Sequence, residues 1–498
     1  MARSLHAYVC IMIAVSMVSV VLAVPGGVAA YALRDPIIIN GDRDFVAANG
    51  VTGGSGTAAD PYVIEGWEIS ASTSPGIQIS STDSYFIIRN VEVRGSSSMP
   101  GGSWGVLLER VSNALLDSVE VTGCYVGIIV RVSSDVTIER CIVHDNTMGV
   151  RLVYCDGVSV LDNTVYSSLF SGIGVAVSTR CIVKGNQMTE NGAGLVLQSS
   201  TRISVTSNIF TKDGITITGK KLAEFDSHAI SSDNLVNGLP VYYYVGVQGL
   251  NLENVPAGEI ILVGCDNVEL KGMTLAGSSV GVEIAFSEVV FLDTCNVQDN
   301  LRGLLVTNSF FIVIRGCALI GNVLGATLES SDFVNVYECQ FVGNDFGLSA
   351  YDSTDILVGS STFTGNMWGV QIELCSRVIV SGNHITTNEV GMILGHCTKT
   401  WVYRNDISHN SNAYGYATGM QVWGGKKLVI EQNNFIGNDI QVVVFERGDI
   451  AWDNGLNRGN HWSDYTGADT DGDLVGETPY VIDSNNQDNF PLVVPYPI

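Results

Sequence analysis

Three consecutive stretches of 22 residues decide the fold: GVEIAFSEVVFLDTCNVQDNLR (281–302), GLLVTNSFFIVIRGCALIGNVL (303–324) and GATLESSDFVNVYECQFVGNDF (325–346). Each begins with glycine, and the same step continues to Gly391. A second series of glycines, with steps of 22 or 23 residues, runs through the first half of the chain: Gly105, Gly127, Gly149, Gly172 and Gly194. A fixed period of this length is the signature of a repeat protein whose units stack on one another.

Apolar residues fill the same positions of nearly every unit. In the unit that starts at Gly303 they are Leu304, Val306, Ile312, Ile314 and Leu319. Apolar residues two apart are typical of a strand with one buried face. Three short strands in each unit predict an all-β solenoid, a right-handed parallel β-helix of about fourteen coils with a cap at each end.

Asparagine forms a polar column three residues before the glycines, as at Asn300, Asn322 and Asn344. Asparagine tolerates left-handed backbone and bonds its own turn, so we expect it at the corners of the coils, with the side-chain amides of successive coils bonding one another.

The chain has 11 cysteines, and most of them share columns with serine. Neighbours in a column lie about 4.8 Å apart with parallel side chains, whereas a disulfide brings its Cβ atoms to about 3.8 Å. We therefore predict buried thiols.

The first thirty residues have the composition of a signal peptide. Arg3 precedes an apolar run from Tyr8 to Val24, and small residues follow at 28–30. The run reaches the lower limit of a spanning helix, so an uncleaved N-terminal anchor is the alternative. In both cases we expect a secreted or cell-surface protein, outside the cytoplasmic membrane.

The other domain boundaries are predicted at the positions where the 22-residue repeat starts or stops. It breaks around the aromatic run Tyr242–Tyr244, and near residue 450 it gives way to a segment rich in Asp, Asn and Gly. The predicted organisation is the signal peptide (1–30), an N-terminal cap with the first strands (31–75), coils (76–214), a protruding insertion (215–258), coils (259–449) and a C-terminal cap (450–498).

The acidic balance restricts the partners. The formal net charge is −25, from 25 basic and 50 acidic residues. Such a charge repels phosphate backbones, so we expect no nucleic-acid partner. Cations and neutral ligands suit it better.

Three short motifs resemble a known family. They are SGTAADPYVIEGW (55–67), NGLPVYYY (237–244) and GNHWSDY (459–465), the last followed by TPY (478–480). They are similar to motifs of the NosD-like proteins with carbohydrate-binding and sugar-hydrolysis (CASH) domains, which are right-handed β-helices of prokaryotic, often archaeal, cell surfaces. The resemblance implies this fold for roughly 36–498. It brings no agreed catalytic residues, although the namesake is tied to copper-site maturation.

An acidic loop near the C-terminus is a candidate calcium site. Asp469, Asp471, Asp473 and Glu477 place carboxylates at alternate positions, and Ca²⁺ takes six to eight oxygen ligands. Leu474 stands where glycine would make the sharp turn of a known calcium loop. The alternative is a solvated acidic turn.

A carboxylate pair is the candidate catalytic site. Glu329 and Glu373 lie two coils apart in one column, so roughly 9.6 Å by the strand spacing. Inverting glycoside hydrolases separate their two carboxyl groups by about 6.5–9.5 Å. Tyr351, Asp352 and His396 lie beside the pair as candidate ligand-binding residues. The alternative is a set of ordinary exposed corner residues.

Copper would need histidine and methionine ligands that converge. His384, His396 and His409 lie in neighbouring coils, with Met392 and Met420 nearby. His384 and His396 occupy different columns, so we expect no copper site.

These patterns favour an exported cell-surface β-helix that binds or presents carbohydrate, a polysaccharide or a cell-surface glycan, without catalysis. The alternatives are a polysaccharide-active glycoside hydrolase, a structural or adhesive surface protein, and a NosD-like copper-handling protein. Outward-facing apolar residues of the second half predict a contact face, covered by residues 215–258 or by self-association with a second molecule: Phe291, Val313, Leu357, Ile379 and Trp401.

Overall fold

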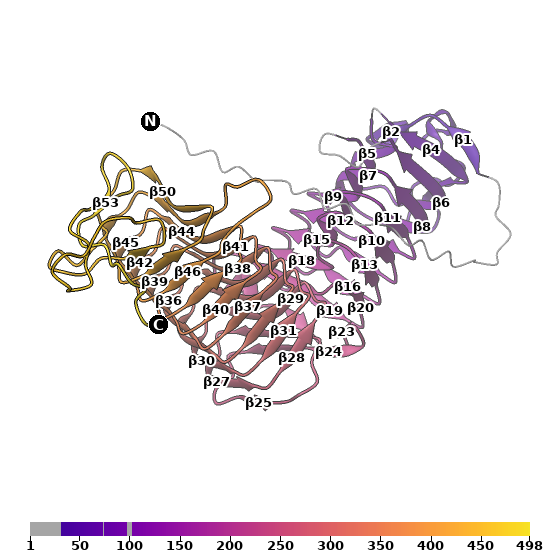
Figure 1. Ribbon diagram of the computed structural model, residues 1–498. Helices are drawn as coiled ribbons and strands as arrows, with labels where there is room; N and C mark the ends of the chain where they lie inside the picture. The colour runs from indigo at the N-terminus through magenta and orange to yellow at the C-terminus, as the bar shows by residue number, and fades with distance from the viewer. Residues whose placement is uncertain (1–30, 73, 97–101) are drawn as a thin grey trace.

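The computed structural model describes residues 31–72, 74–96 and 102–498, so the predicted signal peptide lies outside the described residues. The described chain forms strands β1 to β54 and a short α-helix, α1 (Ala223–Asp226). No helix of this described part is long and apolar enough to cross a membrane. The strands wind into a parallel solenoid, which confirms the predicted fold class (Figure 1).

The solenoid is bent into two arms that form a V (Figure 1). In the N-terminal arm one face is sheet B, an eight-stranded parallel sheet. Its strands are β2 (Ile37–Asn40), β5 (Ile77–Thr82), β7 (Trp104–Val111), β9 (Val126–Arg131), β12 (Met148–Val153), β15 (Ser171–Ala176), β18 (Leu195–Gln198) and β21 (Ile215–Thr218).

The other faces of the N-terminal arm form sheet A. Its strands are β1 (Ala32–Arg34), β3 (Tyr62–Glu65), β4 (Trp67–Ala71), β6 (Phe86–Gly95), β8 (Ala114–Thr122), β10 (Val136–Glu139), β11 (Ile142–His144), β13 (Ser159–Leu161), β14 (Thr164–Tyr166), β16 (Ile182–Lys184), β17 (Gln187–Thr189), β19 (Ser204–Thr206), β20 (Ile209–Thr211), β22 (Ala229–Ile230) and β23 (Leu235–Val236).

Three sheets, E, F and G, wrap the C-terminal arm, and sheet E faces the inside of the V opposite sheet B (Figure 1). Sheet E comprises β24 (Leu239–Val245), β26 (Glu259–Val263), β29 (Val280–Ala285), β32 (Arg302–Thr307), β35 (Leu324–Glu329), β38 (Phe346–Tyr351), β41 (Trp368–Glu373), β44 (Val390–Gly395), β47 (Thr418–Trp423) and β50 (Ile440–Glu446).

Sheet F follows sheet E in each coil. It comprises β25 (Asn251–Glu253), β27 (Asp266–Lys271), β30 (Glu288–Asp293), β33 (Phe310–Arg315), β36 (Asp332–Tyr337), β39 (Thr354–Gly359), β42 (Ser376–Ser381), β45 (Thr398–Tyr403), β48 (Lys426–Glu431) and β51 (Ile450–Ala451). Sheet G comprises β28 (Thr274–Ala276), β31 (Asn296–Gln298), β34 (Ala318–Ile320), β37 (Gln340–Val342), β40 (Thr362–Thr364), β43 (His384–Thr386), β46 (Asp406–Ser408), β49 (Asn434–Ile436) and β52 (His461–Trp462).

The register matches the 22-residue period. Leu304 pairs with Ala326, and Ala326 pairs with Leu348, one coil further on. All three side chains are completely buried inside the solenoid. With eight strands in sheet B and ten in sheet F, the solenoid has more coils than the fourteen predicted.

The asparagine column is buried and bonded along the solenoid axis. The Asn322 amide donates from Nδ2 to Asn344 Oδ1 at 3.1 Å, and Asn344 donates in the same way to Asn366 at 3.0 Å. The predicted bonding between coils is therefore confirmed. The left-handed backbone lies one residue earlier than predicted, at Gly343 (φ 62°) and Gly365 (φ 66°), because the asparagine itself must point inward.

The ten cysteines of the described residues are free and buried, as predicted. Some stack as ladders, and the Cys295 backbone N–H donates to Cys317 Sγ at 3.4 Å. Burial raises the pKa of the Cys141 thiol to about 12, so this side chain acts as a small apolar group.

Residues 215–258 differ from the predicted protruding insertion, because they contribute strands to the solenoid. β21 pairs with β18 as the last strand of sheet B, and β24 pairs with β26 as the first strand of sheet E. The segment is therefore the joint between the two arms. It cannot cover the outer face of sheet F, since β25 is itself a strand of that sheet.

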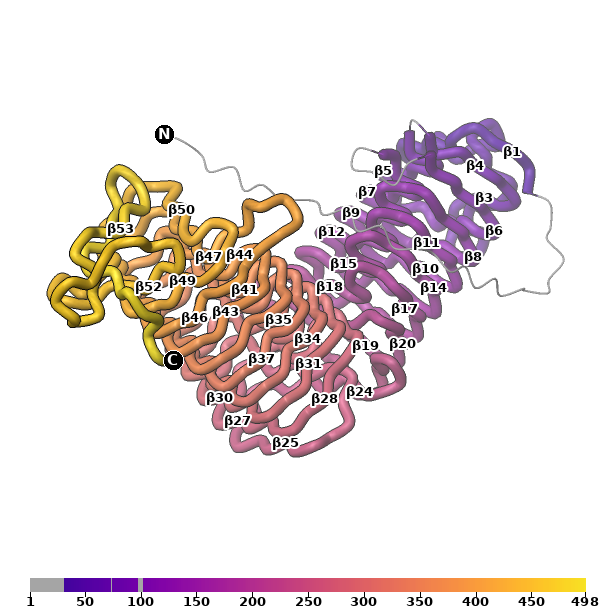
Figure 2. The backbone as a smooth tube through the Cα atoms, viewed as in Figure 1, coloured from indigo at the N-terminus to yellow at the C-terminus, as the bar shows by residue number. Residues whose placement is uncertain are grey.

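The C-terminal segment closes the open end of the solenoid. The indole of Trp462 is buried, stacks on Phe435 of the last coil, and donates from Nε1 to Asp488 Oδ2 at 2.9 Å. Two short antiparallel strands, β53 (Tyr480–Val481) and β54 (Gln487–Asp488), complete it. Figure 2 follows the chain from the regular coils into this cap.

Candidate functional site

The outer face of sheet E carries three parallel rows of side chains, and we call this surface the sheet E face. The residues at the starts of the strands form the first row: Arg302, Leu324, Phe346, Trp368 and Val390. The middle row consists of Leu305, Thr327, Ser349, Gln371, Ile393 and Gln421. The residues at the strand ends form the third row: Thr307, Glu329, Tyr351, Glu373, Gly395 and Trp423.

Aromatic side chains stand on both sides of the middle row. In the first row, Phe346 and Trp368 pack edge to face with ring centroids 4.4 Å apart. In the third row, Tyr351 and Trp423 are 40% and 38% exposed. Phe445 stacks on Trp423 at 4.1 Å. Large, half-exposed rings in ordered rows provide flat apolar contact surfaces beside polar groups.

The structure places the predicted catalytic and ligand-binding residues along one edge of this face. Glu329, Tyr351 and Glu373 are neighbours in the third row. Asp352 and His396 occupy the following corner, where both adopt left-handed backbone (φ 48° and 50°). These five residues therefore lie next to one another on one surface, as their positions in the repeat predicted.

In the proposed catalytic pair, the Glu373 side chain leans away from Glu329. A Cβ added to Gly395 would meet Glu373 Cγ at 2.9 Å, so the Glu373 side chain lies over Gly395, on the side away from Glu329. Glu373 Oε1 accepts from Gln371 Nε2 at 2.5 Å, which holds it there. The glycine at position 395 makes the room for this carboxylate.

Sequence reasoning missed the aromatic members of the face: Phe346, Trp368, Trp423 and Phe445. The signal was present, because Phe346 and Trp368 precede consecutive repeat glycines. A search of that column for aromatic residues would have found them.

A loop between β46 and β47 stands out beside sheet E, toward the opening of the V (Figure 2). It exposes Tyr414 and Tyr416, whose rings are almost parallel with centroids 6.0 Å apart. Asn412 Oδ1 accepts from the backbone N–H groups of both tyrosines, at 3.0 and 3.3 Å. The loop therefore presents its two exposed rings side by side.

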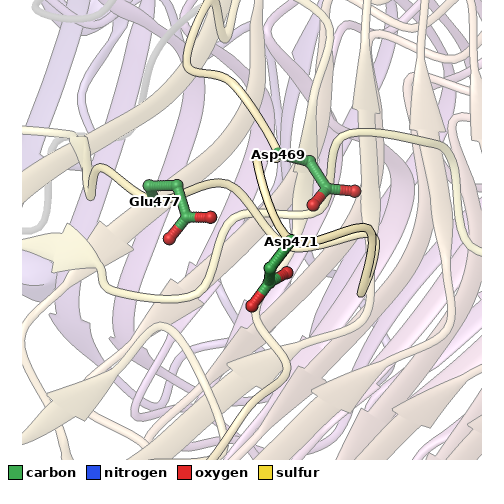
Figure 3. A group of neighbouring side chains, drawn as sticks. All are labelled: Asp469, Asp471 and Glu477. Atoms are coloured by element: carbon green, nitrogen blue, oxygen red, sulfur yellow. The ribbon is translucent and has the colours of Figure 1, made fainter.

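The acidic loop brings three of its four predicted carboxylates together. Oxygen atoms of Asp469, Asp471 and Glu477 lie within 4.8 Å of one another (Figure 3). Asp473 does not join them, and its Oδ1 accepts from the Val475 backbone N–H at 2.9 Å. Asp469 also accepts from two backbone N–H groups of the loop, those of Gly472 and Leu474.

Two family models match the chain. One described as "Right handed beta helix region" matches residues 75–236. The other, described as "Periplasmic copper-binding protein (NosD)", matches residues 227–428. The parallel solenoid and the first match define a right-handed β-helix protein. With the second match, which agrees with the sequence motifs, the chain is a NosD-like β-helix protein.

No curated protein matches the chain. Among solved structures it is similar to the tailspike protein of E. coli bacteriophage HK620, with 12% identity, a TM-score of 0.30, and coverage of 77% of this chain and 74% of that one. It is also similar to PfbA, a surface adhesin of Streptococcus pneumoniae, with 11% identity, a TM-score of 0.24, and coverage of 72% and 84%. Likeness at this level carries no conclusion on function.

The residues considered for copper do not fit such a site. His384 opens β43 in sheet G, whereas His396 follows β44 in sheet E, so their imidazoles lie on different sides of the coil. Met392 and Met420 are neighbours, but both are completely buried in the core. No described contact joins these histidines to the two thioethers.

Proposed function

We propose that this protein binds a neutral glycan chain on the sheet E face, outside the cytoplasmic membrane, and does not cleave it. The observation that carries the proposal is the arrangement of the face, in which two rows containing aromatic rings flank a middle row. The middle row holds the hydroxyl or amide groups of Thr327, Ser349, Gln371 and Gln421, with the apolar Leu305 and Ile393 among them. Ligand sites commonly combine apolar and aromatic surfaces with a few fixed polar groups.

The repeat along the face suits a repeating ligand. Each coil advances by about 4.8 Å and presents the same three positions again. Ring faces at Trp368, Tyr351 and Trp423 can pack on sugar rings, and Ser349, Gln371 and Gln421 supply polar groups between them. A chain of sugars laid along the solenoid axis would meet several such sets.

Charge favours a neutral ligand over an acidic one. The chain has a net charge of −25, and Glu329, Asp352 and Glu373 line one edge of the face. A polyanionic polysaccharide would be repelled both by the whole protein and at this edge.

The location outside the cytoplasmic membrane rests on two supports. One is the composition of residues 1–30, which resembles a signal peptide. The other is the family model whose description names a periplasmic protein.

The test combines a glycan array with an assay for released reducing ends on the same glycans. We expect binding to neutral glycans, weaker binding to uronic-acid or sulfated glycans, and no release. Binding restricted to acidic glycans would contradict the proposed ligand class. Release of reducing ends that is lost in Glu373→Gln would favour the glycoside hydrolase alternative.

We propose that the acidic loop holds Ca²⁺ through Asp469, Asp471 and Glu477, because three close carboxylates repel one another unless a cation lies between them. Chelation should then lower the melting temperature, since a ligand that binds only the folded state stabilises it. Differential scanning fluorimetry with and without EGTA measures the shift. Asp471→Asn should abolish the shift, and Asp483→Asn, in a neighbouring turn, should keep it. An unchanged melting temperature on chelation of the unmutated protein would contradict the site.

Self-association through the outer face of sheet F stays a proposal. Trp401 is 41% exposed on this face, and Phe291 and Phe311 pack edge to face on it at 6.2 Å. The sequence predicted that either residues 215–258 or a second molecule covers this face. Because residues 215–258 do not cover these side chains, we propose a second copy of the chain.

A further inference from the structure

The joint between the arms ends sheet B in an unusual way. Within the described residues β21 is the last strand of sheet B, so one edge of it has no strand partner. On that edge the Ile215 backbone N–H donates to Glu259 Oε2 at 2.9 Å, and the Ile217 N–H donates to Glu283 Oε2 at 3.1 Å. Two carboxyl side chains of the C-terminal arm thus replace a neighbouring strand.

The bonds lie inside a packed interface. Phe225 of α1 meets Phe286 edge to face at 5.3 Å. Ile261, Val263 and Ala285 of the C-terminal arm belong to the same apolar cluster as the core of the N-terminal arm. The end of one arm is therefore docked against the first coils of sheet E, and this lateral docking bends the solenoid (Figure 1).

The two glutamates are enclosed in this interface. Both are 0% exposed, and in each the second oxygen, Oε1, has no hydrogen-bond partner among the described residues. Glu259 Oε2 also accepts from Ser278 Oγ at 2.6 Å. An ionised carboxylate with a bare oxygen in such a place carries a large desolvation cost, which a protonated carboxyl group avoids.

The surrounding charges do not cancel this cost. The positive charge of Arg302 favours the ionised form of Glu283, but its effect is smaller than that of burial. In addition to burial, the charge of Glu283 raises the pKa of Glu259, and the charges of Asp226 and Glu283 raise the pKa of Tyr243. On the N-terminal arm, the carboxyl group of Asp213 accepts a hydrogen bond from the Asn191 side chain. Besides burial, the nearby charge of Glu190 raises the pKa of Asp213.

Burial dominates the titration of these groups. It raises the pKa of Glu283 to about 8 and that of Asp213 to about 7, and it raises the pKa of Glu259 well above the usual range. The folded joint therefore binds protons that the unfolded chain releases near its ordinary pKa of 4.5.

We propose that the joint is a proton-dependent lock, in which the protonated carboxyl groups of Glu259 and Glu283 hold the end of the N-terminal arm on sheet E and loss of these protons releases the arm. Because the folded joint holds the protons more tightly, their stabilising contribution is complete below the unfolded pKa. It falls as the pH rises and is lost as the pH passes the folded pKa. Release would uncover the end of the sheet E face, since Glu283 stands in line with Leu305 and Thr327 of the middle row.

Small-angle X-ray scattering on the full folded protein from pH 5 to pH 9 tests the lock. We expect the maximum dimension to increase as the pH rises through this range and to return on acidification. The variant Glu259→Gln/Glu283→Gln keeps neutral acceptors at both places, so its dimension should stay constant over this range. Glu338→Gln, at an exposed position outside the joint, should behave like the unmutated protein.

An unmutated protein whose dimension is constant from pH 5 to pH 9 overturns the lock, whatever the variants do. A double variant that opens with pH as the unmutated protein does also overturns it, because the two carboxyl groups would then not be responsible. If the double variant does not fold, Glu283→Gln alone should shift the midpoint, and an unshifted midpoint counts against the proposal.

Discussion

The variant Leu319→Asp should fail to accumulate as a folded protein. Leu319 is in β34, with 0% exposure, and lies in the apolar core of the C-terminal arm. The loss of a buried leucine costs about 2–5 kcal/mol, and burial of a charge without a partner adds several more. The sum is comparable with the whole stability of a typical domain, about 5–15 kcal/mol. Soluble yield and the far-ultraviolet circular dichroism spectrum measure the outcome.

Ile320→Asp is the matched control. Ile320 is the next residue of the same strand, but it points outward and is 37% exposed. Successive side chains of a strand point to opposite faces, so the same substitution should be tolerated there. Equal damage at both positions would contradict the assignment of inward and outward columns.

The second large effect is expected for Asn366→Ala. The Asn366 side chain donates to the Phe341 carbonyl at 3.0 Å and to Asn388 Oδ1 at 2.9 Å, and it accepts from the backbone and the side chain of Asn344. Its removal leaves several buried groups without partners, each at about 1–3 kcal/mol. We expect a loss of about 3 kcal/mol or more in the free energy of unfolding of the C-terminal arm, measured by urea denaturation.

Asn335→Ala provides the comparison, because Asn335 is only half-buried on the outer face of sheet F. It should change the free energy of unfolding by less than about 0.5 kcal/mol, as surface substitutions usually do. If the two variants lose the same stability, the asparagine ladder does not hold the coils together.

Much of this structure could be predicted from the sequence because a solenoid is a local fold. The partner of Leu304 is the residue 22 positions later, so the period alone gives the register. The same period places Glu329, Tyr351 and Glu373 in one row. In each case the contact depends on a sequence separation that the repeat already states.

The joint could not be predicted, because its contacts cross between segments that no period relates. The repeat is lost from the sequence of residues 215–258 in either case, whether the segment protrudes from the solenoid or the solenoid axis bends there. Glu283 occupies an outward position of sheet E, and only docking of the other arm buries it. The orientation of Glu373 was likewise hidden, since it depends on the space above Gly395 in the next coil.

The measurement that tests the central claim most directly is calorimetric titration of the best array glycan into tryptophan variants. Trp368→Ala and Trp423→Ala remove one ring from each of the two outer rows of the sheet E face, and Trp401→Ala removes an exposed ring from sheet F. Truncation of an aromatic anchor costs about 2 kcal/mol or more, roughly a 30-fold loss of affinity. We predict this loss for the first two variants and unchanged affinity for the third. Unchanged affinity in the first two, or an equal loss in the third, would contradict the sheet E face as the binding surface.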